Sequence, residues 1–330
     1  MEIALPLLII ALGWVYAYYI GANDSANSIA ASISCRALSP NQAVLLAAAM
    51  TFLGAFAGSE VARTIGTGLI SSEFMTVPVV LSAITGAIVW TAFATYTGMP
   101  VSMTHSIVGG IIGAGASAHT FAAITWEGLI RVTTGLIVSP LAGLVGGIVI
   151  VLILLNLFKN WYPSSATRLF SRGQILSTGF LSFSFGMNNT QNAAGVISAG
   201  LLAAGVTSDF VVPLWVTASC AALIGIGIYL GGRKVIRTTG MRIANIKPVD
   251  GFAADATSGG VIYGASLLGL PISTTHVSVS AIMGVGASRR LSAVRWEVVK
   301  RIVLTWLLTI PASALAAAVL YQFIGLFGCS

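Results

Sequence analysis

The sequence predicts an all-α, polytopic membrane protein built from two inverted-topology repeats with broken or re-entrant helices. Three observations lead to this prediction. Hydrophobic residues make up 56% of the 330 residues and charged residues only 8%, against about 25% charged residues in a typical soluble domain. The few charges are confined to short bands, and polar motifs of the first half return in the second. The composition excludes an ordinary soluble protein.

Stretches without Asp, Glu, Lys or Arg are long enough to cross a membrane, since about 20 apolar residues span the hydrocarbon core. The first apolar stretch, Ile3 to Cys35, contains a single charged residue, Asp24. The later stretches contain none and cover 74–126, 132–158, 174–208, 210–232, 256–288 and 302–330. Together they supply five hydrophobic units in each half of the chain. Several are interrupted by Gly, Pro and polar residues.

Two polar motifs occur twice in the same order. GANDSAN at 21–27 returns as GMNNTQN at 186–192, and positions 21 and 186 are offset by 165 residues. GMPVSMTHS at 98–106 returns as GLPISTTHV at 269–277, and positions 98 and 269 are offset by 171 residues. Matches in the same order at nearly one offset indicate a duplicated half.

The duplication defines the expected domains: a first transmembrane repeat over 1–158, a short cytoplasmic joint over 159–173 and a second, inverted repeat over 174–330. Inversion follows from the bias of Lys and Arg toward cytoplasmic loops. The loop after the second span of the second half carries Arg233, Lys234, Arg237, Arg242 and Lys247. Its counterpart at 60–76 carries only Arg63 against two acidic residues. Equivalent loops on opposite sides require inverted repeats of five crossings, so both termini are expected outside.

The formal net charge of +7 does not indicate a nucleic-acid partner, because the basic residues lie beside apolar spans, where cytoplasmic loops carry them. Membrane lipid is the expected surrounding, in the plasma (inner) membrane of a prokaryote. Gly-rich runs such as 109–118 predict close helix packing, and small-residue helix faces are compatible with a homodimer.

The first motif places Asp24 and several amides in the middle of an apolar helix. An ionisable group at this depth costs about 3 kcal/mol even on the milder insertion scale, which favours a functional role over a structural one. Gly21 and Gly186 are expected to break their helices, and the Asn, Asp and Ser residues after them are common N-cap types. Half-helices starting there would point N–H groups into a cavity, which suits an anion.

The second motif follows the same logic, because Pro100 and Pro271 end any preceding helix. The residues after them offer hydroxyl caps for new helices: Ser102, Thr104, Ser273, Thr274 and Thr275. Two inverted copies would aim four helix starts at one centre, which fits an oxyanion. Alone, such a cluster is more often a cap or a packing surface; its duplication favours binding.

Taken together, GANDSAN, GMPVSMTHS, GMNNTQN and FAADATSGGVIYGASLLGLPISTTH resemble the inorganic phosphate transporter family, whose halves carry a G-x-N-D-x-x-N signature and a P-x-S-x-T-H segment. The similarity covers nearly the whole chain. It implies secondary active uptake of inorganic phosphate, driven by a Na⁺ or H⁺ gradient, with the site at the repeat interface. Many members carry a long intracellular insertion, so the short joint marks a minimal form.

Site roles are carried over by position. The residues expected to bind substrate are Asn23, Asn27, Ser102, Thr104, Asn188, Asn192, Ser273, Thr274 and Thr275. The residues expected to bind the coupling ion are Asp24, Asn23, Asn188 and Asn189, with Na⁺ between Asp24 and Asn189 or a proton on Asp24. Supporting positions behind them are His105, His276 and Gln191. No cofactor beyond the coupling ion is expected.

The chain departs from the family pattern at Asn189, where members usually keep a second Asp. A protonated phosphate donates a hydrogen bond and favours a carboxylate acceptor, whereas sulfate only accepts hydrogen bonds. Asp24 therefore favours phosphate and Asn189 weakens the preference, so a sulfate permease of the same family stays the main alternative. The choice between Na⁺ and H⁺ also stays open.

An anion channel is a further alternative from another class. Rings of Arg or Lys would be expected along its pore, and none interrupts the motif segments. An enzyme is not predicted, because the membrane-embedded titratable groups are taken to be Asp24 and the two histidines, His105 and His276, without a nucleophile and base arrangement.

Overall fold

The structure is a computed structural model that describes residues 3–231 and 246–326. Over this part the chain forms α-helices joined by short turns, with one isolated β-bridge between Ile70 and Ile124. The helices of the first half are α1 (Ala4–Ser34), α2 (Pro40–Gly54), α3 (Glu60–Thr67), α4 (Val77–Thr97), α5 (Met103–His119) and α6 (Trp126–Leu157). Those of the second half are α7 (Pro163–Ala203), α8 (Leu214–Leu230), α10 (Pro248–Leu267), α11 (Thr274–Arg289) and α12 (Trp296–Gly325).

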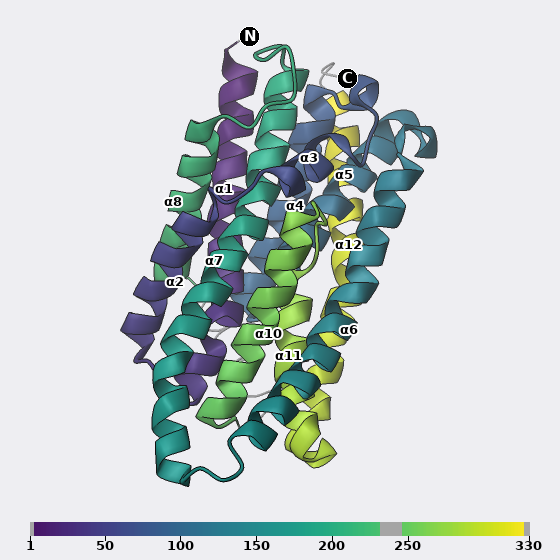
Figure 1. Ribbon diagram of the computed structural model, residues 1–330. Helices are drawn as coiled ribbons and strands as arrows, with labels where there is room; N and C mark the ends of the chain where they lie inside the picture. Colours follow the sequence, from purple (N-terminus) through teal and green to yellow (C-terminus); the bar gives the residue numbers. More distant parts are fainter. Residues whose placement is uncertain (1–2, 232–245, 327–330) are drawn as a thin grey trace.

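The helices form an elongated bundle in which most elements run along its length (Figure 1). Four of them, α1, α4, α6 and α12, are long and apolar enough to cross a membrane. The start of α1 and the end of α12 lie at the same end of the bundle, and the connection from α6 to α7 lies at the other (Figure 1). The expected all-α membrane architecture is confirmed.

Two helical hairpins contain the breaks predicted at the second motif. α4 ends at Gly98, whose φ of 75° is left-handed, and α10 is followed by Gly269 with a φ of 65°. Such angles are open to glycine without steric cost. α5 and α11 then start behind Ser102 and Ser273, whose side chains cap them. The sequence therefore placed both re-entrant breaks correctly.

The helix breaks expected at Gly21 and Gly186 are wrong. α1 and α7 run without interruption through these positions. A Cβ at Gly21 would collide with the carbonyl oxygen of Ile224 in α8, and one at Gly186 with that of Thr51 in α2. The two glycines thus serve close approach of helix backbones. Two helix starts, rather than four, reach the centre.

The last helix of each repeat packs against the hairpin of the other repeat. In α5, Gly113 lies where a Cβ would clash with Ala314 of α12. In α6, a Cβ at Gly147 would likewise clash with Ala281 of α11. Small residues let these backbones approach, and the resulting van der Waals packing is a main source of helix association in lipid. Each hairpin is therefore held by a helix from the other half.

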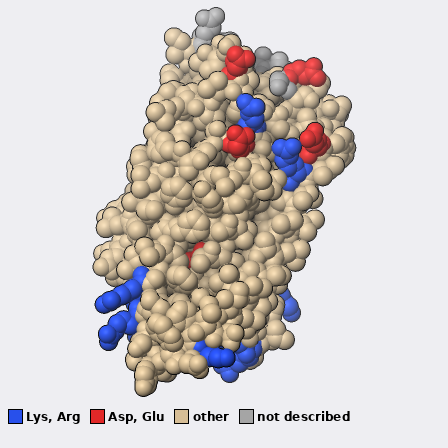
Figure 2. Space-filling model, in the orientation of Figure 1, with Lys and Arg blue, Asp and Glu red and all other residues tan. Residues whose placement is uncertain are grey.

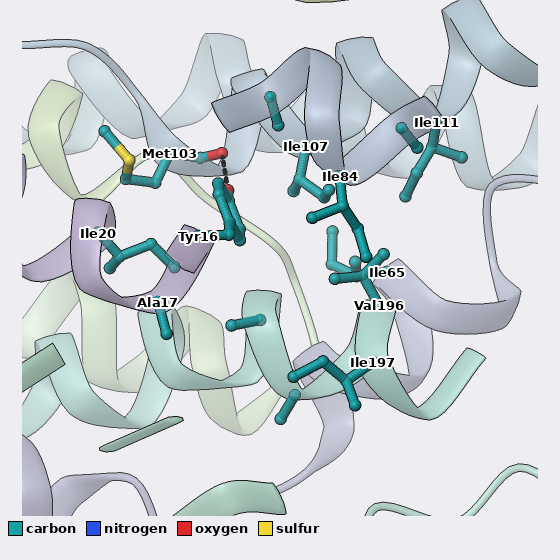
Figure 3. Packing of buried hydrophobic residues seen from close by; sticks show 14 of the residues in the cluster. Tyr16, Ala17, Ile20, Ile65, Ile84, Met103, Ile107, Ile111, Val196 and Ile197 are labelled. Atoms are coloured by element: carbon teal, nitrogen blue, oxygen red, sulfur yellow. Dashed lines mark hydrogen bonds between the residues drawn. The ribbon is translucent and has the colours of Figure 1, made fainter. Parts of the chain in front are cut away.

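Apolar packing fixes the start of α5 against α1. Tyr16 of α1 is fully buried among side chains that include Ile20, Ile84 and Ile107 (Figure 3). Its hydroxyl donates a 2.6 Å hydrogen bond to the backbone carbonyl of Met103, the first residue of α5 (Figure 3). A buried tyrosine normally satisfies its hydroxyl in this way. The contact places the capped helix start beside the polar segment of α1.

Charged residues gather at the two ends of the molecule. On the face shown in Figure 2, Lys and Arg collect toward the lower end, while acidic and basic residues alternate at the upper end. Of the basic loop residues singled out from the sequence, Lys247 precedes α10. The others, Arg233, Lys234, Arg237 and Arg242, lie outside the described residues.

Candidate functional site

The polar segments of α1 and α7 meet at a buried carboxylate. Asp24 of α1 is 3% exposed and Asn189 of α7 is 2% exposed. The Asn189 side chain donates from Nδ2 to Asp24 Oδ2 over 2.7 Å. Because positions 24 and 189 are equivalent in the two repeats, the first and second signatures touch each other directly. The structure brings together Asp24 and Asn189, the two residues between which Na⁺ was expected.

Three further side chains donate to the same carboxylate. Thr274 Oγ1 lies 3.3 Å from Asp24 Oδ2, and Thr275 Oγ1 lies 3.0 Å from Oδ1. Asn27 Nδ2 adds a 3.2 Å contact to Oδ1. A buried carboxylate requires hydrogen-bond donors or a counter-ion, and these donors carry no formal charge. The negative charge of Asp24 is solvated by neutral groups and has no basic partner among them.

The tips of the two hairpins are tied across the repeat interface. Thr275 of the second hairpin donates to the carbonyl of Val101 in the first over 2.9 Å. Thr104 of the first hairpin donates to the carbonyl of Ile272 in the second over 3.0 Å. Positions 104 and 275, like 101 and 272, differ by the repeat offset of 171 residues. The two hydrogen bonds are therefore pseudo-symmetric partners.

The asparagines that end the two signatures support these ties. Asn27 Nδ2 lies 3.0 Å from Thr275 Oγ1, and Asn192 Nδ2 lies 3.0 Å from Thr104 Oγ1. A hydroxyl has one proton, so Thr275 donates to either Asp24 or Val101 at any moment. This threonine consequently links the charge state of the buried site to the contact between the tips.

The first asparagine of each signature holds its own hairpin. Asn23 donates to Thr95 Oγ1 over 3.0 Å and accepts from the backbone N–H of Val101 over 3.1 Å. The equivalent Asn188 donates to Ser266 Oγ over 3.1 Å. Both side chains thus hold their hairpins, and their expected contact with substrate and ion stays a prediction. Thr95 and Ser266, one repeat offset apart, were not identified from the sequence.

The serines that open α5 and α11 act as helix caps. Ser102 Oγ accepts from the backbone N–H of His105, and Ser273 Oγ from that of His276, each over 3.2 Å. This confirms the capping expected from the second motif. The two histidine rings stack edge to face with centroids 4.5 Å apart. They form a buried contact between the two hairpins, behind the site.

Gln191 lies behind the site as well. Its Nε2 donates to the carbonyl of Ala55 over 3.0 Å, next to the end of α2. The side chain thereby fixes α7 against α2, five residues after the close backbone contact at Gly186.

Several amide oxygens at the site lack a donor. Within the described chain, Asn27 Oδ1, Asn192 Oδ1, Asn188 Oδ1 and Gln191 Oε1 are buried without a hydrogen bond. Amide oxygens with free lone pairs are ligands suited to a hard cation. A cavity of about 10 Å³ borders Asp24, together with Ser25, Ser28 and Asn189. That space is close to the smallest volume that holds one water or ion of similar size.

The buried carboxylate of Asp255 was missed from the sequence. Asp255 in α10 is 3% exposed and accepts hydrogen bonds from Gln174 Nε2 over 2.7 Å and Thr178 Oγ1 over 2.8 Å. The expectation that Asp24 was the lone embedded carboxylate is therefore wrong. Its own segment gave no clear signal, because both donors to Asp255 come from α7.

Comparison with known proteins identifies the family that shares this arrangement. The family model for the phosphate transporter family matches residues 20–317. The chain belongs to the phosphate transporter family. The matched region includes both signatures, both hairpins and the helices that hold them, and the resemblance predicted from the motifs is confirmed.

Relatives within the phosphate transporter family match over nearly their whole length. A probable low-affinity inorganic phosphate transporter of Bacillus subtilis (strain 168) is 38% identical over 320 residues, which is 96% of each chain. One with the same description from Rhizobium meliloti (strain 1021) is 38% identical over 323 residues, or 97% of each chain. A solved structure described as the sodium-dependent phosphate transporter superposes with a TM-score of 0.89 at 30% identity, covering 98% of this chain and 100% of that one.

Proposed function

We propose that the protein is a secondary transporter that takes up inorganic phosphate together with Na⁺ by alternating access. The observation that carries the proposal is the buried Asp24, surrounded by neutral donors from both signatures and from the second hairpin. The descriptions of the relatives support phosphate as substrate. The description of the solved neighbour supports Na⁺ as the coupling ion.

Neutral donors around one carboxylate suit a partly protonated oxyanion. The hydroxyls of Thr104, Thr274 and Thr275 and the amides of Asn27 and Asn192 offer N–H and O–H groups to phosphate oxygens. Asp24 accepts the hydrogen bond that the P–OH group donates. Sulfate at neutral pH has no such proton and is repelled by a bare carboxylate, which makes the sulfate permease the weaker candidate.

Sodium has a direct electrostatic role in this scheme. Asp24 and phosphate are both negative, and two like charges in a site of low dielectric repel strongly. A cation held by the Asp24 carboxylate and the Asn189 amide oxygen would offset this repulsion. Phosphate then binds well only when the ion is present, which is the basis of coupling.

Access to the site requires movement, because the cavity of about 10 Å³ beside Asp24 is far smaller than a phosphate ion. The hydrogen bonds from Thr104 to Ile272 and from Thr275 to Val101 close the tips against each other. We propose that these bonds break and re-form during each transport cycle. In this motion the repeat of 1–158 would move relative to the repeat of 174–330. α6 and α12, which each pack on the hairpin of the other repeat, would move with the hairpin they hold.

We further propose that the basic lower end faces the cytoplasm of a prokaryotic cell. Lys and Arg favour cytoplasmic loops, and they gather at the end that contains the α6 to α7 connection (Figures 1 and 2). In this orientation the start of α1 and the end of α12 face outward.

Proteoliposomes test the proposal. Labelled phosphate and labelled sulfate are offered separately, with an inward Na⁺ gradient, an inward proton gradient or neither. We expect saturable phosphate accumulation that depends on Na⁺ and is not competed by sulfate. Sulfate uptake without competition by phosphate would refute phosphate as the substrate. Phosphate uptake driven by the proton gradient alone would refute Na⁺ as the coupling ion. Phosphate flux without accumulation would indicate a channel.

A further inference from the structure

A second cavity lies at the lower end of the bundle, far from the polar signatures in the sequence. It measures about 170 Å³ and is bounded by the end of α6 and the starts of α7 and α10. Its walls are mainly apolar and include Leu154, Leu155, Phe170 and Val249. This cavity joins elements of both repeats at their connection.

Two lysines without acidic partners flank the cavity. Lys159 lies two residues beyond the end of α6, and Lys247 directly precedes α10. Neither takes part in an ion pair among the described residues. The nearest acidic residue in sequence, Asp250, is already bound by Arg289 over 2.7 Å. Among the residues that the structure describes, no carboxylate pairs with the positive charge at the rim.

The cavity lies at the depth of lipid headgroups. The apolar stretch 132–158 ends immediately before Lys159. Trp161 and Tyr162, in the adjoining connection, are 49% and 82% exposed. Exposed Trp and Tyr side chains beside an apolar span mark the membrane interface. An apolar cavity with a basic rim thus opens where phospholipid phosphates are found.

We propose that this cavity binds the headgroup of an acidic phospholipid from the cytoplasmic leaflet. The phosphate lies between Lys159 and Lys247, and the glycerol and upper acyl chain lie against Leu154 and Phe170. A free phosphate ion would gain nothing from the apolar walls, and a neutral lipid would gain little from two lysines. The bound lipid bridges α6, α7 and α10, and so stabilises the junction of the repeats.

Native mass spectrometry of the purified full-length protein tests this site, with phosphatidylglycerol and phosphatidylcholine titrated separately. The double substitution Lys159→Ala/Lys247→Ala should weaken phosphatidylglycerol binding by roughly fivefold for each lysine removed. Ala166→Phe fills the cavity from α7 and leaves both charges in place, and should also abolish the tight binding. Lys300→Ala, an exposed lysine at the start of α12, is the matched control and should bind normally.

Equal loss in the Lys300→Ala control would show general surface attraction and overturn the site. The site would also be overturned if the unaltered protein bound phosphatidylcholine as tightly as phosphatidylglycerol. Unchanged binding after Ala166→Phe would place the lipid elsewhere. Because these measurements record lipid binding and not transport, their failure would leave the proposed phosphate symport untouched.

Discussion

At the scale of single residues, Asp24 is held by four hydrogen bonds from neutral side chains. Such groups stabilise a buried negative charge but cannot cancel it. A mobile cation can cancel it, and can leave again, whereas a fixed Arg or Lys would neutralise the site permanently. The absence of a basic residue from these contacts is therefore what the proposed reversible ion binding requires.

Asp24→Asn keeps the size of the side chain and removes its charge. We expect Na⁺-driven phosphate accumulation in proteoliposomes to fall to background, while membrane insertion and thermal unfolding temperature stay close to those of the unaltered protein. Asp209→Asn, at an exposed aspartate, is the control and should transport normally. Full accumulation by Asp24→Asn would remove the carboxylate from the coupling mechanism.

Asn189→Asp gives the second signature the acidic residue that the first signature carries at the equivalent Asp24. Two carboxylates would then lie where the structure has a 2.7 Å amide to carboxylate contact, and like charges at this distance cannot both stay ionised without a cation. We expect a steeper dependence of phosphate uptake on Na⁺ concentration, measured together with ²²Na⁺ flux to give the number of ions per phosphate. An unchanged ratio with unchanged Na⁺ dependence would show that position 189 does not contact the ion.

At the scale of elements, glycines decide how closely helices approach. Gly186→Ala would force the Cβ into the Thr51 carbonyl of α2, and such overpacking costs about 1 to 3 kcal/mol. Gly260→Ala in α10 meets open space, and removing an interior helix glycine gains about 0.5 to 1 kcal/mol. Thermal unfolding in detergent should therefore show opposite shifts. Two equal shifts would contradict the close approach of α7 and α2.

The lower ends of α10 and α11 are joined by an ion pair. Asp250 accepts from Arg289 Nε over 3.0 Å and from Nη2 over 2.7 Å, and its side chain is 3% exposed. Arg289→Ala removes the cation and leaves the backbone N–H of Lys247 as a donor to this carboxylate, which costs roughly 3 kcal/mol. Adding Asp250→Asn to this variant should recover much of the loss. The unfolding temperatures of the Arg289→Ala, Asp250→Asn and double variants measure this recovery. A loss in the double variant equal to the sum of the two single losses would show that the pair is not coupled.

At the scale of the whole molecule, neither repeat is complete without the other. Hairpin α4–α5 packs on α12, and hairpin α10–α11 packs on α6. The carboxylate comes from the first repeat and its closest amide from the second. Because α6 and α12 pack on the hairpin of the other repeat, each repeat alone would expose the surfaces that its partner covers.

A divided chain tests this interdependence. Fragments 1–158 and 159–330, expressed together, should copurify and transport phosphate, because the cut falls in the connection between α6 and α7. Each fragment expressed alone should fail to accumulate. A chain divided inside α7, between Gly186 and Met187, is the control and should not reassemble. Stable accumulation of either half alone would refute the proposed dependence.

The sequence by itself determined the class of protein and most of the site's inventory. The hydrocarbon core of a membrane excludes charged side chains, so composition and charge-free stretches indicated the membrane architecture directly. Duplicated motifs paired Asp24 with Asn189 and Ser102 with Ser273. The prolines and glycines at 98–100 and 269–271 revealed the hairpin tips, because their backbone preferences are local.

Tertiary structure decided the rest. Whether Gly21 breaks its helix or lets another backbone approach depends on Ile224, more than 200 residues away. The hydrogen bonds from Asn23 to Thr95 and from Thr104 to the Ile272 carbonyl likewise depend on which helices become neighbours. Asp255 stayed hidden because its burial comes from α7 rather than from its own segment. The backbone preference of a segment depends on its own residues and their sequence neighbours. The partner of a buried polar group depends on which distant segments pack against it.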